Sequence, residues 1–394
     1  MNLCIPYMSV YMLGIGFNDF EVGSIASIYI ISQMVFSFLS GALTDKLGRR
    51  FSVLLFDTLG WCVPCVVWIF AVDFRFFVIA ALFNGAMKVP VNAWGCLLVE
   101  DTDKSQITRI YSLILICGHL MALFSPIASL LISRMTLIPA IRVLLINALV
   151  VMSIKNVLLY AISKETAIGV SRMRETKGQS YLSLISGYSG VLRLMRKSKD
   201  IVFSIAIASL YAIISMINTT FWQIVVSKRL NVSDSSLPMF TLLRAAITLF
   251  FFFTVISRIN QLRLKNPLII GFSSYLIGQF ILVLTPSSGP LKYTLLILSL
   301  VFDGFGSGIL ATLSESMIAI HSDEKERARV FAIFQMVVMA VSSPFGWIGG
   351  LLSNVSRILP FIMNLTLIGI GVIITLIHFR ARPHYAPVHH QHQN

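Results

Sequence analysis

The feature that most limits the fold of this chain is a succession of long apolar segments, separated by short polar ones, along nearly the whole sequence. A helix needs about 20 apolar residues to cross the hydrocarbon core of a membrane. Of the 394 residues, 56% are hydrophobic and 12% are charged, which leaves too little polar surface for a soluble domain of this size. The sequence therefore predicts an all-α polytopic membrane protein.

Twelve segments are apolar enough to be transmembrane helices. The first is short, contains Pro6 and lacks flanking cations, so either this helix is stunted or the chain starts upstream of Met1. We expect the helices at residues 2–16, 21–43, 51–71, 75–98, 108–132, 137–161, 201–226, 237–257, 267–285, 291–320, 329–352 and 357–379.

The two halves of the chain repeat one another. Residues 83–85 (Phe-Asn-Gly) match 302–304 (Phe-Asp-Gly), the loop at 103–111 matches that at 323–331, and 125–126 match 343–344 (both Ser-Pro). Such matches in the same order are typical of parallel repeats related by an axis along the membrane normal. They predict two pseudo-symmetric six-helix bundles, at 1–161 and 201–379, joined by a linker at 162–200. Apolar residues recur at helical spacing between Leu184 and Met195 of the linker, which favours a surface helix there or, equally, a plain tether. We expect the tail at 380–394 to be disordered.

The net charge of +14 comes from cations placed mainly in the loops on one side of the predicted membrane. By the positive-inside rule, we expect the loops that carry these cations, and both termini, to lie in the cytoplasm. We expect the protein to lie in the plasma or inner membrane of the cell. Anionic lipid headgroups then account for the charge, and no nucleic acid is needed as a partner. The five cysteines lie within apolar segments, which favours buried thiols over a redox or metal site.

A polar decapeptide, residues 41–50, lies between the second and third apolar segments and reads Gly-Ala-Leu-Thr-Asp-Lys-Leu-Gly-Arg-Arg. Its glycines allow a tight turn, and its acid can pair with its arginines to lock neighbouring helix ends together. We expect a cytoplasmic gate here, and Asp57, within two turns of Arg50, to join it. The predicted gate residues are Gly41, Asp45, Gly48, Arg49, Arg50 and Asp57.

The decapeptide resembles the loop between the second and third helices of major facilitator superfamily (MFS) transporters, whose pattern is Gly-x-Leu-(Ala)-Asp-(Arg)-x-Gly-Arg-(Lys/Arg). The resemblance implies two bundles that rock about a site at mid-membrane, with the first, fourth, seventh and tenth helices lining a central cavity. It implies that the gate stabilises the outward-open state. Drug/proton antiporters of the superfamily carry Gly-Pro-x-x-Gly-Gly in the fifth helix; here Pro126 remains and the glycines do not.

Polar side chains within the apolar segments are the candidates for substrate and proton binding, because such groups are costly in hydrocarbon. Asn84, Lys88 and Asn92 recur at four-residue spacing on one helix face, and Asp303 and Ser307 form a comparable stripe in the tenth segment. We predict that Lys88 and Asp303 face one cavity, where Asp303 binds a proton, Lys88 or a cationic substrate. The alternative is a static buried pair.

Five further candidates lie in other segments, and each could equally serve helix packing. His119 could relay protons or be a neutral, hydrogen-bonded histidine. These residues are Asn218, Trp222, Gln223, Tyr11 and His119.

The function that the sequence favours is secondary active transport by alternating access: a monomer that exports small amphipathic organic molecules, with protons as coupling ion. One alternative is uptake or facilitated transport of a small metabolite, with Lys88 binding a carboxylate. A second is a non-transporting membrane sensor with the same fold. The sequence contains no recognisable phosphate loop, metal-ligand cluster or nucleophile-base pair, so we expect no enzyme activity, no cofactor and no metal.

Overall fold

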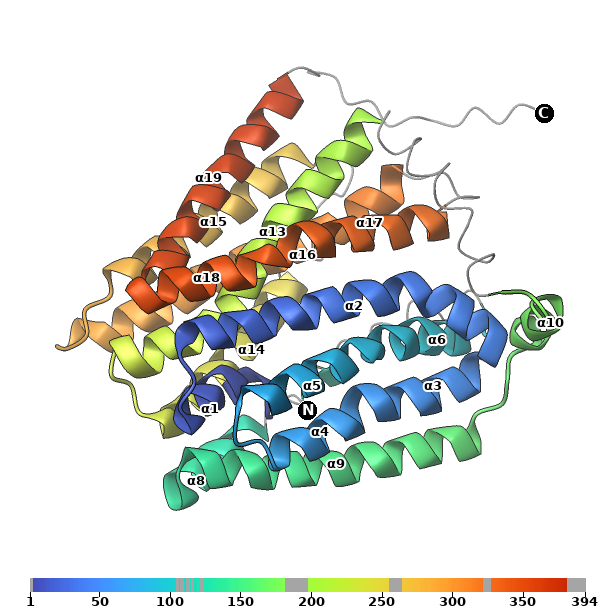
Figure 1. Cartoon of the computed structure of the whole chain (residues 1–394). Helices are drawn as coiled ribbons and strands as arrows, with labels where there is room; N and C mark the ends of the chain where they lie inside the picture. The colour runs from blue at the N-terminus through green and yellow to red at the C-terminus, as the bar shows by residue number, and fades with distance from the viewer. Residues whose placement is uncertain are drawn as a thin grey trace.

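The computed structural model describes residues 3–103, 124–180, 198–254, 264–321 and 327–380, with a few isolated positions between 106 and 120. This part of the chain is helical and contains no strand (Figure 1). The helices of the first half are η1 (Ile5–Tyr7), α1 (Met8–Ile15), α2 (Asp19–Leu47), α3 (Arg49–Asp57), η2 (Thr58–Cys62), α4 (Val63–Ile69), α5 (Phe74–Asn84), η3 (Gly85–Met87), α6 (Lys88–Val99), α8 (Ser125–Met135) and α9 (Leu137–Ile162).

The linker contributes α10 (Ala167–Glu175), and the described ranges of the second half contain seven α-helices and two short helical turns. They are α13 (Lys199–Ile224), η5 (Val225–Arg229), η6 (Asp234–Ser236), α14 (Leu237–Thr254), α15 (Lys265–Leu284), α16 (Leu291–His321), α17 (Arg327–Ser342), α18 (Pro344–Val355) and α19 (Leu359–Arg380).

The predicted all-α membrane fold is confirmed. Within the described ranges, nine helical stretches are long and apolar enough to cross a membrane. The first apolar helix spans only Ile5–Ile15, as short as the sequence predicts. Of the predicted segment 108–132, the structure describes as a continuous helix only the part that belongs to α8.

The third and fourth spans approach one another closely at a glycine. A π-helical turn at Thr58–Cys62 interrupts the third span, and a 3-10 turn at Gly85–Met87 interrupts the fourth. A Cβ atom on Gly60 would lie 2.7 Å from the backbone nitrogen of Met87, so a larger side chain would force these turns apart. The side-chain Nδ2 of Asn84 donates a hydrogen bond to the backbone carbonyl of Gly60. This contact fixes Asn84 at the middle of the bundle.

The two halves of the chain meet along α2 and α18. A Cβ on Gly23 would lie 2.9 Å from the Cα of Gly350, and one on Gly350 would lie 2.8 Å from the Cα of Phe20, so the two backbones are in direct contact. Figure 1 shows α13, α15 and α19 diverging from α2, α3 and α9 with distance from this contact. We call the end of the bundle at Leu47 and α10 the linker end, and the end at Asp19 and Val355 the opposite end.

The linker contains a helix that the sequence did not predict. Helix α10 lies at the linker end beside α2 (Figure 1). The Thr176 hydroxyl donates to the Asp45 carbonyl at 3.3 Å, and the Lys46 ammonium donates to the Gln179 carbonyl at 2.7 Å. The surface helix expected later in the linker lies within 181–197, and the predicted tail at 381–394; both are outside the described residues.

Candidate functional site

A cavity of about 490 Å³ lies between the two halves at mid-bundle. Helices η1, α1, α2, α4 and α5 line it from the first half, and α13, α16 and α17 from the second. The predicted first, fourth, seventh and tenth helices therefore contribute, together with the second, the third and the eleventh. The wall is largely apolar, and none of the described residues that line it is charged. Its polar residues include Ser9, Tyr29, Gln33, Asn84, Tyr211 and Gln335.

Among the predicted substrate residues that the structure describes, only Asn84 lines this cavity. Tyr11 is buried elsewhere and donates its hydroxyl hydrogen to the Trp68 carbonyl at 3.0 Å. Asn92 is exposed, and the Ser307 hydroxyl donates to the Gly304 carbonyl of its own helix. Gln223 is buried outside the cavity lining. His119 lies outside the described residues.

Asp303 is the centre of a buried polar cluster in the second half. The residue is 5% exposed, and its carboxylate accepts hydrogen bonds at 2.7 Å from Asn218 of α13 and at 2.7 Å from Gln279 of α15. An Arg244 guanidinium nitrogen lies 3.5 Å from Oδ2 of Asp303, and this guanidinium also lies over the Trp222 ring, 5.0 Å from its centroid. The cluster thus joins α13, α14, α15 and α16 around one carboxylate.

The prediction that Lys88 and Asp303 face one cavity does not match this arrangement. Neither residue belongs to the cavity lining, and the ionic partner that the structure gives Asp303 is Arg244. The sequence separates Arg244 from Asp303 by 59 positions (303 − 244), so periodicity within a helix could not pair them. Desolvation explains the pairing, because a buried carboxylate requires compensating donors.

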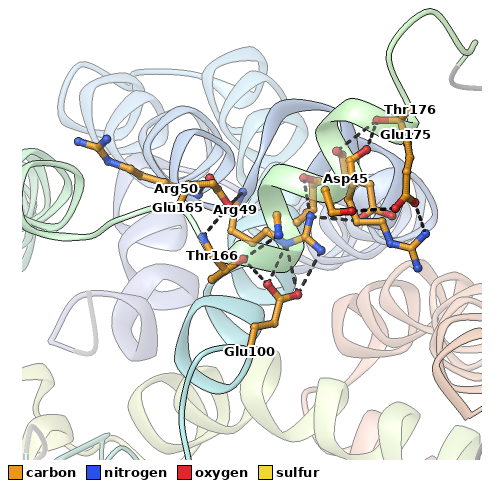
Figure 2. Close-up of polar contacts among 12 residues, drawn as sticks. Asp45, Arg49, Arg50, Glu100, Glu165, Thr166, Glu175 and Thr176 are labelled. Carbon is orange, nitrogen blue, oxygen red and sulfur yellow. Dashed lines mark hydrogen bonds and ion pairs between the residues drawn. The ribbon is translucent and has the colours of Figure 1, made fainter.

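At the linker end, the predicted gate residue Arg49 is 4% exposed, and Figure 2 shows it among the polar side chains that surround it. Its guanidinium lies 3.1 Å from a carboxylate oxygen of Asp45, one turn away, and 3.1 Å from one of Glu100, which follows α6. The Thr166 hydroxyl donates a hydrogen bond to the same Glu100 carboxylate. The predicted pairing of Asp45 with Arg49 is therefore present, and Glu100 is a second acid that the sequence analysis missed.

The carboxylate of Glu165, in the linker, binds the start of α3 (Figure 2). It accepts hydrogen bonds at 3.0 Å from the backbone nitrogens of both Arg49 and Arg50. These amides are free of intrahelical partners at a helix N-terminus, where the helix dipole also favours a negative charge. Gly48 precedes them with φ +84°, a conformation that suits glycine, and a Cβ there would lie 2.7 Å from the Glu165 carboxylate.

Two of the predicted gate residues have partners outside the Arg49 network. Arg50 donates through its side chain to the Tyr160 carbonyl at 2.8 Å, and its guanidinium lies over the Tyr160 ring. Asp57 forms an ion pair with Lys155 of α9 rather than joining Arg50. Gly41 has open space around it. The described contacts of this network stay within the first half and the linker, so they do not themselves hold the two halves together.

The opposite end does contain polar contacts between the halves, and the sequence analysis missed them. Asp19 at the start of α2 is 3% exposed; it accepts a hydrogen bond at 2.5 Å from the Ser353 hydroxyl and lies 3.3 Å from Arg357. The Asn354 side chain accepts from the Phe20 backbone nitrogen at 3.2 Å. Because these pairs are more than 300 positions apart, only their placement at helix ends could have suggested them.

Long apolar helices around a central cavity, with charged clusters at the helix ends and a carboxylate, Asp303, buried within the second half, define a polytopic helical membrane protein of the transporter class. The family model "Major Facilitator Superfamily" matches residues 1–291 and, in a second match, 203–393. The chain belongs to the Major Facilitator Superfamily, as the decapeptide at 41–50 led us to expect.

Solved structures with the same fold include known transporters. The crystal structure of the nucleoside transporter NupG is 16% identical to this chain, covers 96% of each chain and has a TM-score of 0.70. A POT family transporter in complex with a thioalcohol-conjugated peptide is 15% identical, covers 98% of this chain and 93% of its own, and has a TM-score of 0.68. No curated protein sequence matches the chain.

Proposed function

We propose that this protein is a proton-coupled secondary transporter that exports small amphipathic organic molecules by alternating access. The family match and the shared fold show that the protein is an MFS member with a transporter fold. The observation that carries the proposal of proton-coupled export is a central, mainly apolar cavity together with a buried carboxylate, Asp303, that is not part of the cavity lining. Apolar ligands need few polar contacts, and such cavities suit them.

Helix α13 links the cavity to the proposed proton site. Asn218 of α13 donates to Asp303, while Met216 and Thr219 of the same helix line the cavity. Protonation of Asp303 removes the charge that holds Arg244 and changes the acceptors available to Asn218. A change in the position of α13 would then alter the cavity wall. In this proposal the proton and the substrate bind at separate places and are coupled through a shared helix, whereas the sequence analysis considered Asp303 for binding either of them.

The polar contacts between the two halves at the opposite end support the proposal of alternating access. If the linker is cytoplasmic, as the positive-inside rule predicts, the Asp19–Ser353 and Asp19–Arg357 contacts close the outer end of the bundle. Transport would require these contacts to break while the halves rock about the cavity. The alternative of metabolite uptake with Lys88 as carboxylate ligand loses its support, because Lys88 is not part of the cavity lining.

The test is export of an uncharged amphipathic dye, Nile red, from cells that express the full chain, with and without a collapsed proton gradient. We expect gradient-dependent exclusion of the dye by the natural protein and its loss in Asp303→Asn, which keeps size but cannot exchange a proton. Asp73→Asn is the matched control, because Asp73 caps α5 through the Arg75 amide and asparagine caps equally well. Full export by Asp303→Asn would refute the proposed coupling, and dye accumulation by the natural protein would indicate uptake.

A further inference from the structure

The central cavity carries polar side chains with hydrogen-bonding capacity left over. Ser9 of α1 is 5% exposed, and its hydroxyl has no partner among the described residues. Gln33 of α2 is 8% exposed and Gln335 of α17 is half-buried; the described part of the chain supplies no partner to either carboxamide. A buried polar group without a partner costs free energy. Such groups facing a cavity are therefore suited to bind a ligand.

The two carboxamides come from different halves of the protein. Gln33 lies midway along α2, Gln335 lies midway along α17, and the two helices pack against one another. Both side chains line the same cavity. A solute that bonds to both would touch both halves at once, and its binding would depend on how the halves are placed.

A carboxamide has a donor and an acceptor side by side. Its complement is an edge on which an acceptor and a donor are also adjacent, as in a lactam, an imide or a nucleobase. A hydroxyl such as that of Ser9 can add a single bond as donor or acceptor. A carboxylate or an ammonium group offers only acceptors or only donors, and so cannot satisfy both groups of a carboxamide.

The remainder of the wall selects against charge. The described lining holds no acid and no base, while Trp68, Phe77 and several methionines supply flat or adaptable apolar surface. An ion without a counter-charge would be costly to bring into such a site. The ligand should thus be uncharged, with one hydrogen-bonding edge and one apolar face.

We propose that the cavity binds an uncharged heterocycle of the lactam or imide type, held through its adjacent donor and acceptor by the Gln33 and Gln335 carboxamides. This rests on the proposed transport function only for the choice of cavity, and it names the substrate class of that site.

The test is equilibrium binding to the purified full chain without any gradient, read by thermal shift, with uridine and 2-pyridone as probes. Their partners 3-methyluridine and N-methyl-2-pyridone lack the lactam or imide N–H, and orotidine adds a carboxylate to uridine. We expect at least one probe to bind about tenfold more tightly than its N-methyl partner, the ratio that one hydrogen bond supplies, and uridine to bind more tightly than orotidine. Equal binding within both methylated pairs, or no binding by either probe, would overturn the proposal, as would a preference for orotidine.

Substitutions of the two glutamines test whether Gln33 and Gln335 are the residues that bind the probes. Gln33→Met and Gln335→Met remove a carboxamide and keep the length of the side chain. In each variant, the ratio of the affinity for the N–H probe to that for its N-methyl partner should fall toward one. Gln179→Met, in the exposed linker, should leave this ratio unchanged. If both cavity variants keep the full preference, the glutamines are not the ligands. Because no proton gradient is used, a failure here leaves the Asp303 result standing, and a failure of the Asp303 test leaves this one interpretable.

Discussion

Burial decides which of the arginines near the linker end matters to stability. Arg49 and Arg172 both pair with glutamates, at 3.1 Å and 2.9 Å. The Arg49 side chain is 5% exposed, whereas that of Arg172 is 54% exposed. Water and salt screen the exposed pair, but the buried one has no substitute for its partner. The two ion pairs have similar distances, but we expect the buried Arg49–Glu100 pair to contribute far more to stability than the exposed Arg172–Glu175 pair.

Arg49→Ala should destabilise the protein by about 3–5 kcal/mol, because it leaves the carboxylate of Glu100 buried without its counter-charge. Arg172→Ala should cost at most about 0.5 kcal/mol, as exposed pairs do. Thermal unfolding of the two purified variants in the same detergent measures the difference. Equal melting temperatures for the two would mean that Glu100 finds another donor.

Among the elements, α3 is the one whose start depends on a distant segment. Its first two amides are bound by Glu165, more than 100 positions away, and Gly48 supplies the turn that brings them there. The linker is thus part of the first bundle's structure and more than a tether. Its helix α10 continues the contact through Thr176.

Glu165→Ala should loosen the first turn of α3 by about 1–2 kcal/mol, the usual cost of a lost N-terminal cap. The measurement is hydrogen exchange of the amides of Arg49 and Arg50, which should speed up about tenfold or more. Glu175→Ala removes an exposed carboxylate on α10 and serves as control. Unchanged protection at Arg49 would show that Glu165 does not cap the helix in solution.

The apolar pattern and the decapeptide were enough to predict the helical class, the family and the Asp45–Arg49 pair. The prediction worked because these features are local: a span is contiguous, and this pair is four positions apart. Arg244, Glu165 and Arg357 were not assigned to their partners, because each partner lies far along the chain and only the packed bundle brings it near. Gln33 and Gln335 were visible as polar residues in apolar segments and could have been found by that signal.

At the scale of the whole molecule, the backbone contact between α2 and α18 determines how tightly the opposite end closes. Gly350→Ala places a methyl group about 2.8 Å from the Cα of Phe20, so the halves must separate there. Ala26 of α2 lines the cavity. We expect faster labelling of an Ala26→Cys reporter by an impermeant maleimide applied from the opposite end, in a background without the native cysteines. Gly369→Ala, which meets no atom within 4 Å, is the control. Equal labelling rates would place the barrier elsewhere.

The absence of acids and bases from the described cavity wall has an electrical consequence. A neutral cargo moving along such a wall carries no current, so each turnover would transfer only the charge of any proton taken up at Asp303. A membrane voltage acts on one elementary charge with about 2.3 kcal/mol per 100 mV and on an uncharged solute not at all. The voltage sensitivity of the cycle would then report on the coupling ion alone, whichever molecule the cavity carries.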